Sequence, residues 1–411
     1  MRRPSRRAVL GVAGSSVAAL AAVRLGLPRT QRPGPVLGID ALSDEARALV
    51  DAAFAGVERR LMWDSHAHLV GLGAGDTGAA VNPDMRSHLH PWKRLQFEIY
   101  LAAAGVDDLA RADEIYRERL LALHRAANPE GRLLLLAFDW RVGPDGAEDP
   151  RRSTFYMPNE RVLELAAQHA DVEACVSIHP YRADAIERLE LAAAAGARAV
   201  KWLPNAMGMD PASERCDRFY RKLVELGLVL VSHGGLEKAV HAEEDQELGN
   251  PLRLRRAIEH GARVVVAHCA STGTGIDLDD PGRGRAPCFD LFLRLLEEAG
   301  PEGTLYGDVS AMTQVNRCGD PLRTLLLRGD LHGRLVNGSD YPLPAIDLLV
   351  STRLLDRHGY LREGERGPLN ELFAANPLLF DFVLKRRLRV AEGGREHAFA
   401  ARVFESGRLF G

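Results

Sequence analysis

Cysteine is scarce in this chain. Its 411 residues include five cysteines, an odd number, and they are scattered without a Cys-x-x-Cys pair. A disulfide-stapled fold would carry an even and closely spaced set, and a cysteine-based zinc site would show paired cysteines. The sequence therefore argues against both kinds of framework.

An excess of charge of one sign is also lacking. The formal net charge is -3 at pH 7, and no basic stripe occurs beyond the N-terminus. A protein that binds duplex nucleic acid usually presents such a stripe, so we expect no nucleic-acid partner. Apolar residues make up 46% of the chain and charged residues 27%, which is typical of a globular protein.

Only the N-terminus joins a basic cluster to an uncharged apolar run. Residues 2–7 read Arg-Arg-Pro-Ser-Arg-Arg, residues 8–23 are small and apolar, and Ala19-Leu20-Ala21 offers a small-x-small cleavage pattern. This order is typical of a secretory signal, and the segment from Ser5 to Leu10 resembles a twin-arginine export signal. We therefore predict that residues 1–23 direct export to the periplasm or the cell exterior.

The same run is shorter than the roughly 20 residues that a membrane span needs. We expect no stable membrane span after the signal is removed, whereas an uncleaved signal would tether the protein to the membrane. A disordered basic tail is the other interpretation. The resemblance to a twin-arginine signal implies a protein that is exported already folded.

The rest of the chain has a repeating rhythm. Residues 24–45 contain several prolines and glycines and are predicted to be a linker. From residue 46 to residue 411, short apolar runs alternate with stretches of helical periodicity. Eight such runs occur, at Leu61–His66, Arg132–Asp139, Glu173–His179, Arg198–Leu203, Leu228–His233, Arg263–His268, Thr304–Asp308 and Arg334–Asp340. Nearly continuous apolar runs are typical of parallel strands, which are buried on both faces.

Eight strand–helix units predict a (β/α)8 barrel, a TIM barrel of the α/β class, in a single domain with C-terminal helices. An open doubly wound sheet is the alternative, but no Gly-x-Gly-x-x-Gly motif follows the first run. Residues 69–110 after the first strand and 270–287 after the sixth form long connections. We expect both to be mouth loops that cover a substrate, because active sites of barrels lie at that end.

Polar residues close five of the predicted strands. Strands one, four, five, six and eight carry, at or near their ends, His66 and His68, Lys201, His233, His268, and Asp340. Each has an ordinary explanation when taken singly, such as a helix cap or a buried ion pair. Together, at the end of the barrel where catalytic groups gather, they predict a metal site. Imidazole and carboxylate are common zinc ligands, so zinc is the expected ion.

This set resembles the metal-binding pattern of the amidohydrolase superfamily, and the match runs from about Leu61 to Pro344. The residues around His233, His268 and Asp340 look most like the branch that contains aminocarboxymuconate semialdehyde decarboxylase. Lys201 looks instead like the strand-four lysine of the phosphotriesterase and dihydroorotase pattern, which is carboxylated and bridges two metals. The resemblance therefore implies one or two divalent metals.

The state of Lys201 decides how the resemblance assigns the ligands. If Lys201 is carboxylated, two metals are implied, one on His66, His68 and Asp340 and the other on His233 and His268. If Lys201 stays an amine, a single metal is implied on His66, His68, His233 and Asp340, and His268 is free for acid–base work. We favour two metals, since a two-metal site clamps both the attacking and the leaving atom.

The expected activity is hydrolysis by a metal-activated water, whose pKa the metal lowers toward about 7. Asp340 would act as general base and then as general acid, with His268 and Lys201 as further catalytic residues. The substrate would be a small molecule with an amide, ester, lactone or related bond. A single-metal decarboxylase or hydratase, a lyase acting on a small carboxylic acid, is the alternative. A binding protein with a relict site is disfavoured, because the ligand set is complete.

Further residues are weaker candidates. Substrate binding is predicted for Arg86, His179, Arg182 and Asn205, with Arg182 as a bidentate clamp for a carboxylate. Asp139 and Asp308 close two other strands and could orient ligand histidines. His88 and His90 form a second His-x-His, but in a loop, where a substrate-facing or surface position is expected. The identity of the substrate and the formation of homo-oligomers are left open.

Overall fold

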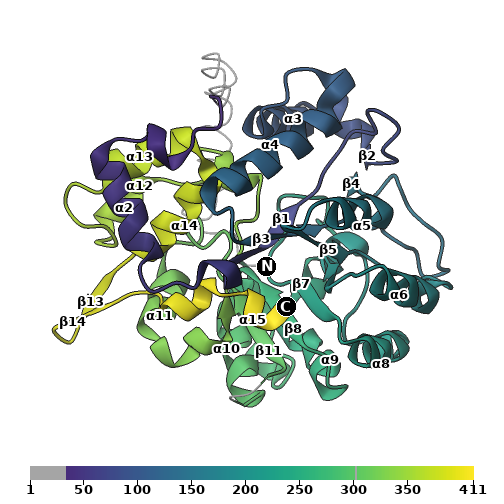
Figure 1. Ribbon diagram of the computed structural model, residues 1–411. Coiled ribbons are helices and arrows are strands. Elements are labelled where there is room, and N and C mark those ends of the chain that lie inside the picture. Colours follow the sequence, from purple (N-terminus) through teal and green to yellow (C-terminus); the bar gives the residue numbers. More distant parts are fainter. Residues whose placement is uncertain (1–33, 301–302) are drawn as a thin grey trace.

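The computed structural model describes residues 34–300 and 303–411, so the predicted export signal and residues 24–33 of the predicted linker lie outside the described residues. A barrel of eight parallel strands forms the centre of the molecule (Figure 1). In their order around the barrel, the strands are β1 (Trp63–His68), β3 (Arg132–Leu136), β5 (Val172–Val176), β6 (Ala199–Trp202), β7 (Val229–His233), β8 (Val264–Ala267), β11 (Leu305–Asp308) and β12 (Leu335–Val336). Each strand lies in or next to one of the eight predicted runs, which confirms the predicted TIM barrel.

The last strand closes the barrel against the first. β12 is only two residues long, but the chain after it continues beside β1. The Ser65 amide donates to the Asn337 carbonyl at 3.1 Å, and the Asp340 amide donates to the His66 carbonyl at 2.6 Å. The eighth run therefore leaves regular strand geometry earlier than predicted while it stays hydrogen-bonded to β1.

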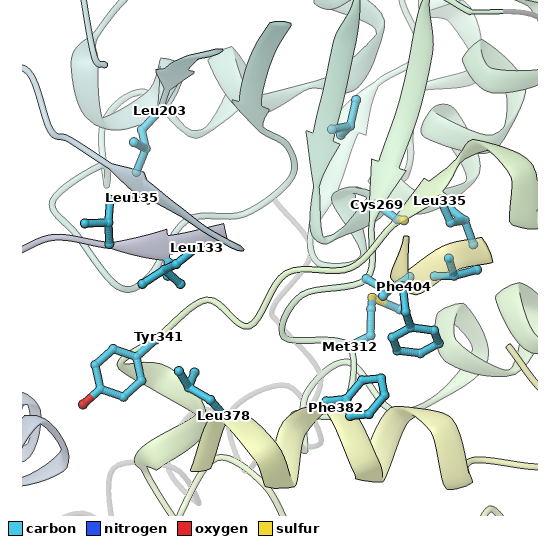
Figure 2. Close-up of a cluster of buried hydrophobic side chains, with 14 of the residues drawn as sticks. Leu133, Leu135, Leu203, Cys269, Met312, Leu335, Tyr341, Leu378, Phe382 and Phe404 are labelled. Atoms are coloured by element: carbon cyan, nitrogen blue, oxygen red, sulfur yellow. The ribbon is translucent and has the colours of Figure 1, made fainter. Parts of the chain in front are cut away.

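Side chains along the strands alternate between two apolar layers. Leu134 and Leu136 of β3 belong to the layer inside the barrel, whereas Leu133 and Leu135 belong to the layer between strands and helices. Figure 2 shows part of the outer layer, where Leu378 and Phe382 project from α14 (Pro377–Arg387) toward the strands. This alternation follows from the two-residue period of a strand, and it decides which strand-end side chains face the interior.

The inner layer is closed at the N-terminal end of the barrel by the last helix, α15 (Gly407–Phe410). Phe410 stacks on Trp63, at the start of β1, with ring centroids 6.4 Å apart. The opposite end of the barrel is therefore the end that is open to a ligand.

Helices follow the strands as expected. Those between strands include α4 (Ala112–Ala127), α5 (Asn159–Gln168), α6 (Ala185–Ala194), α8 (Asp217–Leu226), α9 (Arg255–Glu259), α10 (Cys288–Glu298) and α11 (Asp320–Leu327). Gly227 ends α8 with a φ of 69°, a left-handed conformation that glycine adopts without a steric cost. After β12 come α12 (Thr352–Arg357), α13 (Arg366–Ala375) and α14. No helix among the described residues is long and apolar enough to cross a membrane.

Helical structure begins inside the segment predicted as linker. α2 (Asp44–Phe54) packs beside α13 and α14 (Figure 1). Its N-cap residue Ser43 accepts a hydrogen bond from the Ala46 amide and donates one to Glu371 of α13 at 2.6 Å. A serine cap followed by two acidic residues starts α2 at Asp44, inside the segment predicted as linker.

Both predicted mouth loops contain regular structure. Residues 69–110 include β2 (Ala80–Val81) and α3 (Pro91–Ala104), and residues 270–287 include the hairpin of β9 (Thr274–Ile276) and β10 (Arg285–Pro287). α3 carries apolar side chains on more than one face. It therefore lacks the one-sided pattern by which an amphipathic helix is recognised in a sequence.

Candidate metal centre

The barrel brings all six candidate ligands to the C-terminal ends of its strands. β1 extends to His68, two residues beyond the predicted run, and so carries both His66 and His68. Lys201 lies on β6 and His233 ends β7, each two residues after a side chain of the inner layer. His268 and Asp340 follow β8 and β12. Strand alternation therefore directs Lys201 and His233 toward the barrel axis. The register of β1 shifts between Asp64 and Ala67, and His268 and Asp340 lie beyond their strands with positive φ.

The donor atoms of five of these side chains lie close together. His66 Nε2 is 3.3 Å from His68 Nε2 and 3.1 Å from Lys201 Nζ. Asp340 Oδ1 is 3.6 Å from His66 Nε2 and 3.4 Å from His68 Nε2, while its Oδ2 is 3.8 Å from His268 Nε2. His66, His268 and Asp340 each offer a donor atom within 4.8 Å of the others. This cluster is therefore able to bind a metal ion.

Asp308, the last residue of β11, holds two of the histidines. His66 Nδ1 donates to Asp308 Oδ2 at 2.7 Å, and the His268 amide donates to Asp308 Oδ1 at 2.9 Å. His268 Nδ1 lies 2.8 Å from Ser310 Oγ. Because Nδ1 of each ring has a partner, Nε2 of each ring faces Asp340. Asp308 thus has the position expected of a residue that orients ligand histidines.

His233 belongs to the same cluster, with Nδ1 of its ring beside Glu237 and Nε2 left free by the residues that the structure describes. His233 Nδ1 lies 3.3 Å from Glu237 Oε2, and Glu237 in turn accepts from the Ala239 amide at 2.5 Å. His233 Nε2 is buried and has no hydrogen-bond partner among the described residues. A buried ring nitrogen without a partner needs an explanation, and coordination of a metal would supply one.

Burial sets the protonation of the cluster. It lowers the pKa of all four imidazoles, that of His233 to about 4, and it also lowers the pKa of Lys201. Burial raises the pKa of Asp340 to about 6. Burial alone would raise the pKa of Asp308 as well, but the charge of His66 and its hydrogen bond outweigh this effect and hold that pKa below the ordinary value. The imidazoles are therefore neutral at pH 7, the form that binds metals.

The backbone at the centre adopts conformations that few residues tolerate. φ is 54° at His268, 49° at Cys269, 49° at Ala270 and 63° at Asp340. Left-handed backbone costs on the order of 1–3 kcal/mol for a residue other than glycine, and such residues cluster at functional sites. Beside them, a Cβ on Gly338 would lie 2.4 Å from His66 Cβ, so only glycine lets the two segments approach this closely.

A cavity of about 790 Å³ opens above the cluster, and all six candidate ligands line it. Its walls are mostly apolar and come from α3, from the start of α4 and from the segment after Asp340. Tyr116 of α4 also donates to the His68 carbonyl at 2.6 Å. The arrangement is therefore a buried set of donors at the floor of a large cavity with an apolar wall.

Two of the four predicted substrate-binding residues have polar partners within the protein, outside the cavity. Arg182 donates to Asp139 through Nη2 and Nε, at 2.6 and 2.8 Å, and to Glu148 through Nη1 at 2.7 Å. His179 Nε2 lies 3.1 Å from the Met207 carbonyl. The bidentate contact expected of Arg182 is thus made to a carboxylate of the protein itself, and Asp139 contacts Arg182 rather than a ligand histidine.

The other two predicted residues also lie outside the walls of the cavity. Asn205 is fully buried, and its Nδ2 donates to the Gly235 carbonyl at 3.2 Å. Arg86 is exposed, as are His88 and His90. None of the four predicted substrate-binding residues is among those that line this cavity.

The sequence interpretation missed Glu237, Arg317 and α3, all of which line the cavity. Glu237 follows His233 by four residues, and Arg317 is the one charged residue between Val309 and Cys318. A lone charge in an uncharged segment after a strand would have been the signal for Arg317. For Glu237, the signal was its closeness to a candidate ligand.

A closed parallel barrel that gathers imidazole, amine and carboxylate groups above a cavity defines a barrel enzyme with a potential metal centre. The chain belongs to the amidohydrolase family, whose family model matches residues 63–347. That range contains all six candidate ligands.

Solved structures of similar fold are distant in sequence. An uncharacterized TIM-barrel protein from Bordetella bronchiseptica is 14% identical, with a TM-score of 0.48, and the match covers 78% of this chain and 99% of that one. IDCase from Metarhizium anisopliae is 11% identical, with a TM-score of 0.40, over 87% and 98% of the two chains. The 2,6-dihydroxybenzoate decarboxylase from Rhizobium is 14% identical, with a TM-score of 0.33, over 62% and 87%. No curated protein matches the chain. These similarities are too distant to bear on the reaction.

Proposed function

We propose that the protein is a metal-dependent hydrolase that cleaves an amide, ester, lactone or related bond in a small molecule. One observation carries the proposal: six potential ligands from five strands meet at the floor of a single cavity. The unpartnered Nε2 of His233 and the shared approach of His66, His268 and Asp340 support a metal there. Family membership supports the same class of chemistry.

We favour a centre with two metals. His66, His68 and Asp340 Oδ1 would hold one metal and His233 and His268 the other, and Asp340 Oδ2 faces His268. Lys201 forms no ion pair with a carboxylate among the described residues, and burial lowers its pKa toward the neutral amine. A neutral amine is the form that takes up carbon dioxide. A carboxylated Lys201 would supply the anionic bridge.

Zinc or another divalent metal in this centre would polarise a substrate carbonyl and lower the pKa of a water molecule. Asp340 would accept the proton of that water during attack and then deliver it to the leaving group. In the metal-free protein, burial raises the pKa of this carboxyl to about 6. His268, oriented by Ser310, faces the same carboxylate through Nε2.

The test compares Asp340→Asn and the double variant His66→Ala/His68→Ala with the parent enzyme on a panel of neutral esters, amides and lactones. Loss of the general base should lower kcat/KM by about 10²–10⁴-fold, and the double variant should lose bound metal, as measured by elemental analysis. His88→Ala, which changes an exposed histidine, is the matched control and should alter neither value. Full metal content together with unchanged activity in both variants would refute the proposal.

The number of metals decides between this hydrolase and its alternative. We expect two metals per chain and a carbamate signal in NMR spectra after incubation with isotopically labelled bicarbonate, with Lys201→Met as the control. One metal per chain and a free Lys201 amine would favour the single-metal lyase instead.

We also propose that the protein is exported through a twin-arginine-type signal, on the basis of the basic and apolar pattern of residues 1–23. Changing Arg6 and Arg7 to lysine should leave the protein in the cytoplasm, as judged by cell fractionation. An unchanged distribution would contradict the proposal.

A further inference from the structure

The cavity wall contains a buried cation that the proposed chemistry does not use. Arg317 lies in the segment after β11, is 8% exposed and lines the cavity wall. Its Nη1 donates to Ser271 Oγ at 2.8 Å, and its Nε is buried without a hydrogen-bond partner. Within residues 34–300 and 303–411, no carboxylate forms an ion pair with it.

A guanidinium keeps its charge at any physiological pH, so a buried one calls for an anion. Three carboxylates lie near enough to act on Arg317 electrostatically, namely Asp340, Glu237 and Asp308. Each is engaged elsewhere, since Asp308 and Glu237 contact histidines and Asp340 faces the metal ligands. Arg182, also deeply buried, shows the contrast, because two carboxylates of the protein satisfy it.

The polar groups beside Arg317 suit a carboxylate. Arg317 Nε has no partner, and the Ser271 hydroxyl accepts from Arg317 and so keeps its own hydrogen for a second acceptor. Guanidinium groups bind carboxylates through two adjacent nitrogens, an arrangement that a lysine cannot reproduce. One unsatisfied guanidinium balances one negative charge, which indicates a monoanion.

The rest of the cavity is mostly apolar and larger than a small polar substrate requires. Leu95 and Ile99 of α3, Tyr116 of α4, and Ile346 and Leu349 of the segment after Asp340 line one continuous wall. α3 and α4 lie next to each other over the barrel (Figure 1). A cavity of about 790 Å³ with such a wall suits a ligand that buries a long hydrocarbon or aromatic portion.

We infer that the site takes a monoanionic amphiphile, whose carboxylate binds Arg317 and Ser271 and whose apolar portion lies along α3. The inference rests on the proposed function only for the bond that is cleaved. It assigns to Arg317 the substrate contact that the sequence interpretation assigned to Arg182.

Binding of fatty carboxylates to the metal-loaded enzyme, measured by calorimetry, tests both halves of the inference. In the series hexanoate, octanoate, decanoate, Kd should fall by roughly fourfold for each added methylene, because each buries apolar surface. Decanamide, which has the same chain without the charge, should bind about ten- to a hundred-fold more weakly than decanoate. A Kd independent of chain length would overturn the apolar half.

Variants of Arg317 test the anionic half. Arg317→Met should weaken decanoate by about ten- to a hundred-fold and leave decanamide unchanged. Arg317→Lys keeps the charge without the two-nitrogen geometry, so its Kd for decanoate should lie between the values of the parent enzyme and of Arg317→Met. This variant carries the test if the methionine variant does not fold. Arg182→Met removes a buried arginine outside the cavity and should leave the Kd of decanoate as it is. If the metal rather than Arg317 holds the carboxylate, decanoate binding will be unchanged in both Arg317 variants. That result would overturn the inference.

These measurements need no turnover. Arg317-dependent binding in an enzyme that hydrolyses no member of the ester, amide and lactone panel would count against the hydrolase alone. Hydrolysis of neutral esters without any binding of decanoate would count against the amphiphile alone.

Discussion

The segments that follow β5 and β11 contain similar residues and use them differently. The first contains His179 and Arg182, and each of these side chains has polar partners outside the cavity. β11 itself ends at Asp308, which orients His66, and the segment after it contains Arg317, which lines the cavity. The comparison shows that a strand-end position makes a residue a candidate, whereas the partners it finds in the fold decide whether it is available to a ligand.

The largest expected effect is a loss of stability without a loss of function, and it concerns the partner of Arg182 in the first segment. Asp139→Asn leaves the buried Arg182 without its bidentate partner, and the free energy of unfolding in denaturant should fall by about 3 kcal/mol. Metal content and kcat/KM should stay at the parent values, because neither residue lines the cavity. The double variant Asp139→Asn/Arg182→Met should recover part of the stability, since it leaves no uncompensated buried charge. A loss of metal in Asp139→Asn would contradict the purely structural role assigned to this ion pair, and with it the difference between the two segments.

The second effect is the matching change at the end of β11. Asp308→Asn removes the carboxylate that accepts from His66 Nδ1 and from the His268 amide. Loss of such an orienting partner typically costs 10–100-fold in metal affinity, so competition with a chelator should show a decrease of about that size. Metal affinity equal to that of the parent enzyme would mean that Asp308 plays the same structural role as Asp139.

The third effect is a pH dependence that distinguishes Asp340 from Asp308. Burial raises the pKa of Asp340 to about 6, so below that pH its carboxyl is protonated and must lose a proton before it can bind a metal. Metal affinity should therefore rise with pH by up to about tenfold per unit until pH 6 and flatten above it. Asp308 should add nothing to this slope, because its pKa lies below the ordinary value. Asp340→Asn should reduce the slope, and an equal slope in both proteins would contradict the assignment.

The smallest effect concerns the backbone after β11. Ala311 has a φ of 56°, and the segment after β5 has no residue with positive φ between positions 177 and 185. Ala311→Gly should relieve this strain, but glycine also increases the conformational entropy of the unfolded chain. The net gain in stability should therefore be less than about 1 kcal/mol. The midpoint of denaturant unfolding should rise slightly while kcat/KM stays constant. A clear destabilisation would show that the Ala311 side chain, which is buried, contributes more by packing than it costs by strain.

The strands were predictable because their signal is local. A run such as residues 133–136, Leu-Leu-Leu-Leu, must be buried on both faces, and glycines mark the ends of the helices between such runs. α3 was missed because its apolar side chains lie on more than one face. The end of β12 was placed too late, since residues 337–340 keep their hydrogen bonds to β1 without regular strand geometry.

The sequence alone determined the eight strands and the position of His66, His68, Lys201, His233, His268 and Asp340 at their ends, because strand periodicity and the order of the units are properties of neighbouring residues. Only the tertiary structure decided which charges face the ligand. Arg182 and Arg317 each follow a strand, but Asp139 and Glu148 reach the first from other parts of the chain, and no carboxylate among the described residues pairs with the second. Pairing of buried charges depends on residues that are distant in sequence, and for that reason the contact expected of Arg182 falls to Arg317.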